Sequence, residues 1–253
     1  MSKESLIRGR RLALICLALS GLAPPLLAPS STASAQGAPK AAVAYPGRSA
    51  ASLPAREHFV YARSVGDVAG KLDIELARKS SGGKSWYELV SHAPDEDALY
   101  TLDALSLALI RSDVTTRTAT TTIRRLTEVV EDRLVLDPDE LQISATEPFQ
   151  QRIRLIPFEE KPVYRLIFQG SQSMPGFSLI LSVLGRETVA VEGRTWDCWK
   201  VEVGAKGVVG SFFGKSHYWY QAEWPHALIK FEGPSSYPGS PMTRLELLSY
   251  SSS

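Results

Sequence analysis

Cysteine is scarce in this sequence, which excludes a fold held together by disulfide bonds. The 253 residues include only Cys16 and Cys198. Cys16 lies in an apolar N-terminal stretch that we expect to be removed, so Cys198 is left without an intramolecular partner. A lone cysteine within a strand is more often a small apolar filler than a nucleophile, which needs a depressed pKa and a neighbouring base. The fold must therefore rest on its hydrophobic core.

An excess of one charge and the common catalytic motifs are also lacking. The chain has 28 basic and 27 acidic residues, with no basic stripe, so it does not have the electrostatic footprint of a nucleic-acid-binding protein. It contains no G-x-S-x-G, H-E-x-x-H, P-loop or G-x-G-x-x-G element. No histidine stands at zinc-ligand spacing. The histidines are His58, His92, His217 and His226. We expect no catalytic residue, no metal and no cofactor.

Acidic residues are grouped at three places, but each group falls at a predicted turn or strand end. These groups are Glu131-Asp132, Asp137/Asp139-Glu140 and Glu159-Glu160. Solvated turn residues explain them most simply. Acid–base chemistry of the glycosidase type needs two carboxyl groups that face each other across a cleft. A hydrolase that uses Cys198 or such a carboxylate pair is therefore only a weak hypothesis for this sequence.

The longest apolar run near the N-terminus, Leu12–Ala23, is too short to span a bilayer. It follows several basic residues and precedes Ala33-Ser34-Ala35, which fits an A-x-A cleavage site. We expect a secretory signal peptide over 1–35, export to the periplasm, and no transmembrane span after cleavage. An uncleaved anchor is the alternative, which Pro24-Pro25 disfavour. The Ala-, Pro- and Ser-rich residues 36–55 predict a flexible leader, and residues 56–253 a single β domain.

Alternation of apolar and polar residues dominates the domain. Leu72, Ile74 and Leu76 alternate with charged residues, which is typical of a strand with one buried face. Gly185–Val203 consists of two alternating runs around Glu192-Gly193-Arg194, which predicts a hairpin. Further strands are expected at 56–62, 86–91, 107–116, 120–130, 133–136, 151–156, 163–168, 217–220, 227–232 and 244–250.

Two apolar stretches leave the choice between helix and strand open. Leu99–Ile110 has leucines at helical spacing, but it also fits a strand–turn–strand that pivots near Asp103-Ala104. Phe177–Leu184 fits a buried strand or a short buried helix. With no convincing long helix, the pattern predicts an all-β fold. We expect a single antiparallel curved sheet, a half-barrel or open barrel of about 11–13 strands.

The C-terminal third resembles a bacterial envelope family, domain of unknown function 3108. The likeness rests on Gly185-Arg186-Glu187-Thr188, on Gly193 before Thr195-Trp196-Asp197-Cys198, and on Trp219-Tyr220 followed by Ile229-Lys230. It extends loosely over 57–250, where Asp103–Leu107 resembles the family's aspartate–turn segment and favours strand–turn–strand there. The resemblance implies a half-barrel similar to lipoprotein-localisation carriers of the LolA/LolB type, which hold acyl chains in an apolar concavity. It brings no functional residues, because the family has no settled activity.

These observations favour an exported, non-enzymatic protein that binds a lipid or another apolar ligand in the concavity of a β half-barrel. Aromatic side chains supply large apolar area for such a cleft. The expected ligand-binding residues are Trp86, Phe168, Trp199, Trp219 and Tyr220. The alternative is a structural or protein-interaction module of the cell envelope, whose aromatic residues are buried in its own core or against an envelope protein.

Overall fold

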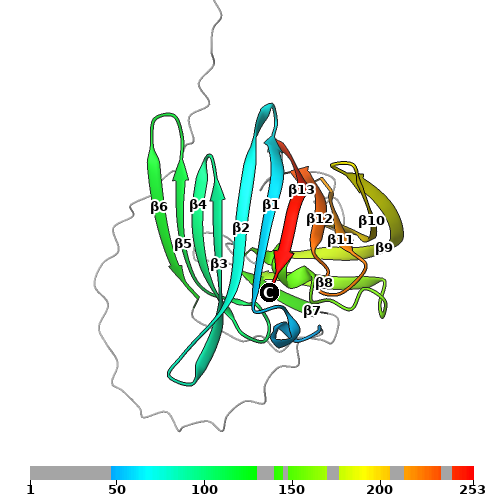
Figure 1. The fold of residues 1–253 in the computed structure, drawn as a ribbon, viewed down its shortest axis with the longest axis horizontal. Helices are drawn as coiled ribbons and strands as arrows, with labels where there is room; N and C mark the ends of the chain where they lie inside the picture. Colours follow the sequence, from blue (N-terminus) through cyan, green and yellow to red (C-terminus); the bar gives the residue numbers. More distant parts are fainter. Residues whose placement is uncertain (1–46, 130–139, 145–147, 170–176, 206–213, 235–240) are drawn as a thin grey trace, which may run out of the picture. The chain divides into compact units, whose positions relative to one another are not determined.

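The structure is a computed structural model that describes residues 47–129, 140–144, 148–169, 177–205, 214–234 and 241–253, and these residues contain thirteen strands (Figure 1). The strands are β1 Arg56–Val65, β2 Val68–Ser81, β3 Lys84–Ala93, β4 Glu96–Asp103, β5 Leu109–Arg117, β6 Thr122–Glu128, β7 Glu140–Ser144, β8 Val163–Gln169, β9 Phe177–Val191, β10 Arg194–Gly204, β11 Ser216–Gln221, β12 Leu228–Pro234 and β13 Met242–Ser252.

All thirteen strands belong to one sheet, in the order β6-β5-β4-β3-β2-β1-β13-β12-β11-β10-β9-β8-β7. Neighbouring strands are antiparallel except β7 and β8, which are parallel. Within the described residues the sheet is not closed, because β6 and β7 lie at its two ends. Figure 1 shows β2–β6 on one side of β1 and β13, and β9–β12 on the other. The predicted all-β open half-barrel is confirmed. The strand expected at 133–136 lies outside the described residues.

One face of the sheet carries most of the core. Phe59, Leu76 and Leu89 are fully buried on it, and the residues that pair with them in register project to the same side. We call this the core face and the opposite side the outer face. Most of the buried apolar residues fall into two clusters. The larger joins β1, β13 and β7–β12, and the smaller joins β2–β5.

Two sequence ambiguities resolve toward strands. At Leu99–Ile110, β4 ends at Asp103 and β5 begins at Leu109. The Asp103 carboxylate accepts hydrogen bonds from the backbone N–H groups of Leu105 and Ser106 at 3.0 and 2.9 Å. An aspartate that binds the backbone in this way stabilises a turn. Phe177 begins the fifteen-residue strand β9, which pairs with β10 through Glu192 and Gly193. Both have positive φ, 49° and 72°, as a two-residue type I′ turn requires.

The strand predicted at 151–156 is wrong. Phe149–Ile153 forms the short helix α1, and the chain continues through tight turns in which Leu155 and Ile156 donate to Arg152 and Ile153. All residues from Gln151 to Phe158 are buried. When every residue is buried, the alternation of apolar and polar residues that distinguishes a strand is lost. The sequence therefore indicates that this segment is buried, but it does not indicate whether the segment is a strand or a helix.

The last residues before β1 also pack on the sheet. They include the 3-10 helix η1, Ala50–Ser52, and belong to the range that the sequence predicts to be a flexible leader. Ala50 and Leu53 are buried in the smaller cluster, and the Tyr87 hydroxyl donates to the Ala50 carbonyl at 3.0 Å. The first sheet residue, Arg56, is where the sequence predicts the domain to begin.

Candidate functional site

A segment of the chain itself covers the core face of the C-terminal strands. We call Pro148–Glu160 the inner segment. Its apolar residues Ile153, Leu155, Ile156 and Phe158 are at most 2% exposed. The Phe158 ring lies 5.4 Å from that of Tyr220 and 6.3 Å from that of Trp199. The core face of β10 and β11 is therefore filled by the protein's own side chains where the inner segment crosses it.

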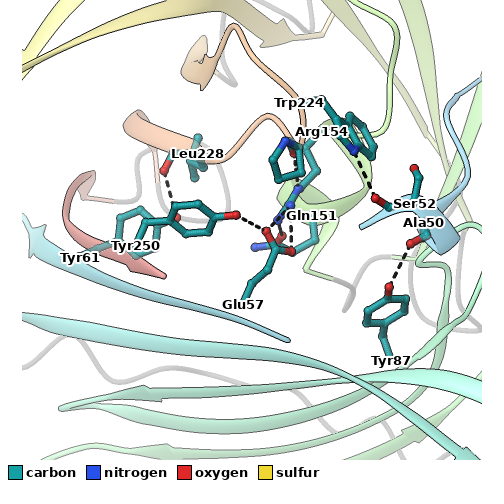
Figure 2. Close-up of polar contacts among 11 residues, drawn as sticks. Ala50, Ser52, Glu57, Tyr61, Tyr87, Gln151, Arg154, Trp224, Leu228 and Tyr250 are labelled. Atoms are coloured by element: carbon teal, nitrogen blue, oxygen red, sulfur yellow. Dashed lines mark hydrogen bonds and ion pairs between the residues drawn. The ribbon is translucent and has the colours of Figure 1, made fainter. Parts of the chain in front are cut away.

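A buried ion pair joins the inner segment to β1 (Figure 2). Arg154 and Glu57 have side chains 1% and 0% exposed, and one guanidinium nitrogen lies 2.7 and 2.9 Å from the two carboxylate oxygens. The other two nitrogens donate to the Gln151 side chain at 3.0 Å and to the Pro225 carbonyl at 2.9 Å. The Tyr250 hydroxyl donates to Glu57 at 2.8 Å. Every guanidinium nitrogen therefore has an acceptor.

This arrangement serves positioning rather than chemistry. A buried ion pair adds little net stability, but the loss of one partner leaves an uncompensated charge and costs about 3–5 kcal/mol. Neither Glu57 nor Arg154 has exposed surface on which a substrate could lie. The pair therefore fixes the inner segment in one place against β1 and β13.

Buried tyrosine hydroxyls hold the same region together. Tyr220 donates to the Gln150 carbonyl at 2.9 Å, and Tyr61 to the Leu228 carbonyl at 3.1 Å. Burial raises the pKa of both phenols above the usual range, and it raises the pKa of Tyr250 to about 12 with the nearby Glu57 charge as a further cause. These hydroxyls stay protonated and act as hydrogen-bond donors.

The core face is less covered on β4, β5 and β6, which we call the wing. Ala98 on β4 and Ser112 on β5 are buried, but Tyr100 and Val114 on the same face are only half-buried. On β6 the core face carries Ile123, which is 43% exposed, and the exposed Arg125, which pairs in register with Val114. Tyr100 packs at the margin of the smaller cluster, where burial raises its pKa to about 12. Apolar surface on the core face is therefore accessible on the wing.

A cluster of aromatic and charged residues lies on the outer face of β9–β13. Trp219 sits between Lys200 and Lys230, whose ammonium nitrogens lie 5.1 and 5.2 Å from its ring. Its indole N–H donates to Glu187 at 2.5 Å. The lysines and their carboxylate partners leave Trp219 only 6% exposed. Cation–π contacts and ion pairs of this kind stabilise the sheet from outside.

The structure brings together only two of the five aromatic residues predicted to bind a ligand. Trp199 and Tyr220 pair in register on the core face and both contact Phe158. Trp219 and Trp86 each precede a buried core-face tyrosine and project to the outer face. The backbone of Phe168 pairs with Ile143 and Phe177, and its side chain lies outside the described residues.

Cys198 is fully buried in the larger cluster, and burial raises the pKa of its thiol to about 12. A thiol with this pKa is not a thiolate near neutral pH, so it is not an activated nucleophile. Among the described residues, no group of three or more histidines, cysteines and carboxylates could hold a metal ion. Of the acidic groups, Glu159 pairs with Arg48 at 2.5 Å and Glu140 with Arg165 at 2.5 Å. Residues 131–139 lie outside the described part of the chain.

Sequence reasoning missed Glu57 and Arg154, although each leaves a trace in the sequence. Glu57 stands two residues before Phe59, so alternation puts its carboxylate on the face that carries the aromatic core. Arg154 interrupts an apolar run between Ile153 and Leu155. A charge at a core position predicts a buried partner of opposite sign, because an unpaired buried charge is costly. Which acid belongs to which base is decided only by the fold.

No known protein family and no curated protein matches the sequence. Among solved structures, a β-barrel-like protein of domain of unknown function DUF1849 from Brucella abortus is 11% identical. That match covers 79% of this chain and 99% of that chain, with a TM-score of 0.44. The lipoprotein LppX of Mycobacterium tuberculosis is 10% identical over 79% of this chain and 88% of its own, with a TM-score of 0.28. A DUF1329 family protein from Desulfovibrio piger is 9% identical over 80% and 87%, also at 0.28. These likenesses are too distant to assign a function.

The helices in the described part of the chain include none that is long and apolar enough to cross a membrane.

Proposed function

We propose that this chain is an exported, non-enzymatic protein that binds a lipid or another apolar ligand on the core face of its open sheet. Export rests on the signal-peptide pattern of residues 1–35. We also propose that the chain is related to domain of unknown function 3108, which it resembles in sequence, and that it is located in the periplasm.

The observation that carries the proposal is the accessible apolar surface on the core face of the wing. Tyr100 and Val114 are half-buried, and Ile123 is 43% exposed, on the face that elsewhere in the sheet forms the core. Removal of apolar surface from water contributes about 25 cal/mol per Å². An acyl chain that continued the smaller cluster over these residues would gain that free energy without displacing the inner segment.

The ligand-binding residues remain part of the proposal. Of the five named from the sequence, Trp199 and Tyr220 lie on the face where the ligand is proposed to bind. Both contact the inner segment. Trp199 is only partly buried, so it would contact a ligand at the border of that segment, whereas Tyr220 is fully buried beneath it and would be reached only if the segment moved. The wing adds Tyr100, Val114 and Ile123 as the residues that we expect to contact the ligand first.

The test is lipid extraction and native mass spectrometry of the protein purified from the cell envelope, followed by titration with a fluorescent fatty acid. We expect extractable lipid and saturable probe binding. Val114→Glu places a carboxylate opposite Arg125 on the core face, and we expect it to weaken probe binding at least about tenfold, because an apolar ligand would desolvate both charges. Thr115→Glu is the matched control, since Thr115 is the next residue of β5 and projects to the outer face.

Two outcomes would contradict lipid binding. One is an apo mass with no response to the probe. The other is equal probe affinity for the Val114 and Thr115 variants when circular dichroism and thermal unfolding show that both are folded.

The second candidate is a structural or protein-interaction module of the envelope. The filled core face under the inner segment favours it, because Ile153, Ile156 and Phe158 already occupy the space that a ligand would need there. A stoichiometric protein partner in a crosslinked pull-down, together with no extractable lipid, would support this candidate over the first.

A further inference from the structure

Strand β6 ends the sheet, and its backbone groups indicate which residues can form further hydrogen bonds. The described residues supply only β5 as its neighbour. The Val129 N–H donates to the Ile110 carbonyl at 3.0 Å, and Thr118 donates to Thr121 at 2.8 Å at the other end of the hairpin. The backbone N–H and C=O groups of successive residues point to opposite edges of a strand. Because Val129 and Thr121 bond to the β5 side, the odd-numbered residues of β6 bond to β5. The N–H and C=O groups of Thr122, Arg124, Leu126 and Glu128 therefore point away from β5, toward the edge on which the described residues place no further strand.

This edge is unusually exposed and partly apolar. Leu126 is 59% exposed on the outer face and Ile123 is 43% exposed on the core face. An exposed edge strand is a template for pairing with another strand, and charged residues usually prevent such pairing. The charges of β6 are Arg124, Arg125 and Glu128. Whether they oppose or support pairing depends on the register.

Pairing with a second copy is complementary in one antiparallel register. When Leu126 lies opposite Leu126 of the copy, Arg124 lies opposite Glu128 and Ile123 opposite Val129. Arg125 then faces Thr127. A centre at Arg124 or at Arg125 would place two like charges directly opposite each other, which is destabilising. A centre at Thr127 would place Leu126 opposite Glu128. The register centred on Leu126 also uses the even-numbered residues, whose backbone groups have no strand partner among the described residues.

The charges on the outer face extend this match across two strands. Arg124 donates to Asp113 on β5 at 2.8 Å, and Arg111 lies 3.9 Å from Glu128. In the register centred on Leu126, a line of alternating charge forms, from Asp113 through Arg124 to Glu128 and Arg111 of the copy. The two-fold axis generates the same line a second time.

We propose that β6 is a self-association edge, at which a second copy of this chain pairs antiparallel through β6 in the register centred on Leu126. The interface is isologous, so it closes at two copies. The two sheets become continuous, and the exposed Leu126 side chains contact each other.

Charge reversal tests the register. Sedimentation equilibrium of the purified full chain over a wide concentration range is expected to show a monomer–dimer equilibrium. Arg124→Glu and Glu128→Arg each create two like-charge pairs and are expected to weaken dimerisation at least about tenfold. An equimolar mixture of the two variants is expected to restore the dimer, since the introduced glutamate of one chain then faces the introduced arginine of the other. Arg194→Glu, at the exposed β9–β10 turn, is the control and should leave the dimer unchanged.

A crosslink tests the geometry without charge changes. In a hydrogen-bonded antiparallel pair the Cα atoms are about 5.5 Å apart, which lies within the disulfide range of about 4.4–6.8 Å. Under mild oxidation, Leu126→Cys should form a disulfide-linked dimer. Arg124→Cys should not, because its counterpart lies four residues away along the register, about 13 Å. A monomeric wild-type chain at every concentration, failure of the mixture to restore the dimer, or equal crosslinking of both cysteine variants would overturn the proposal.

Discussion

Two regions of one sheet share the same strand pattern and differ in what covers them. On β11, the core-face residues Tyr218 and Tyr220 are at most 2% exposed. On β5, Val114 has the equivalent place in the alternation and is half-buried. The inner segment lies over the first region. Alternation therefore specifies which face is apolar, whereas the burial of that face depends on a segment from elsewhere in the chain.

The charges of the two regions differ in the same way. The Glu57–Arg154 pair is buried under the inner segment, whereas the Arg124–Asp113 and Arg117–Asp97 pairs on the wing are exposed to solvent. Water screens an exposed pair, and its loss changes stability little. A buried pair has no such compensation. The same type of substitution should therefore lower the free energy of unfolding more in the region under the inner segment than on the wing.

The largest expected effect is loss of the buried pair. Arg154→Met leaves the Glu57 carboxylate buried without its cation, and we expect the free energy of unfolding to fall by about 3–5 kcal/mol. Arg117→Met on the wing, which removes one partner of the exposed Arg117–Asp97 pair, is the matched control and should have little effect. Urea denaturation followed by tryptophan fluorescence measures both. The double variant Glu57→Leu, Arg154→Met should be more stable than Arg154→Met alone. Equal losses of unfolding free energy at Arg154 and Arg117 would contradict the distinction between the two regions.

Truncation of apolar side chains has the second-largest expected effect. Ile156→Ala in the inner segment is expected to cost about 2–5 kcal/mol, because Ile156 is fully buried and the cavity collapses only partly. Val114→Ala on the wing should cost distinctly less, since its side chain is only partly buried. Denaturant midpoints of the two variants provide the comparison. If lipid is bound to the wing, its addition should raise the cost of the Val114 truncation and leave that of Ile156 unchanged.

The smallest expected effect is a pH dependence that originates at His226. Its Nδ1 donates to the Gln221 carbonyl at 2.9 Å, and its buried Nε2 has no hydrogen-bond partner in the described part of the chain. Burial lowers the pKa of this imidazole, with the Gln221 bond opposing the shift and the charges of Arg48, Glu159 and Arg154 as smaller influences. As the pH falls below about 6.5, the unfolded chain takes up a proton that the folded chain does not.

Folding stability should therefore decrease on acidification from pH 8 to pH 5, and His226→Asn should remove this part of the decrease. Asparagine tolerates the positive φ of 54° at this position. The readout is the difference in unfolding free energy between wild type and variant at each pH. A difference that stays constant over the range would show that His226 does not contribute to the pH dependence.

Local pattern was sufficient for most strands and for their turns. Glu192-Gly193 predicted a hairpin because few residues adopt two successive positive φ angles, and the alternation around Ile74 predicted a one-sided strand. The same reasoning failed at Gln151–Ile156, where every residue is buried and the sequence shows no alternation between buried and exposed positions. It also left Leu99–Ile110 open, since four leucines fit a helix face as well as two short strands.

The candidate site was less accessible to sequence reasoning than the fold. Trp219 and Tyr220 are neighbours in the chain, so alternation places one on each face, but nothing local indicates which of them faces the core. Tyr220 faces the inner segment, and Trp219 lies between two lysines on the outer face. Exposure of Ile123 is likewise a property of the edge position of β6 and not of its sequence.

Side-chain period and turn geometry are local properties of the chain, so the residues alone specify a single open β-sheet with one mainly apolar face. Which part of that face is covered depends on contacts that form only in the folded protein. The inner segment lies on it because Arg154 meets Glu57 and Tyr220 meets Gln150, contacts that join residues 97 and 70 positions apart. Pairings at such separation depend on the closure of long loops around a formed sheet, which no local pattern encodes.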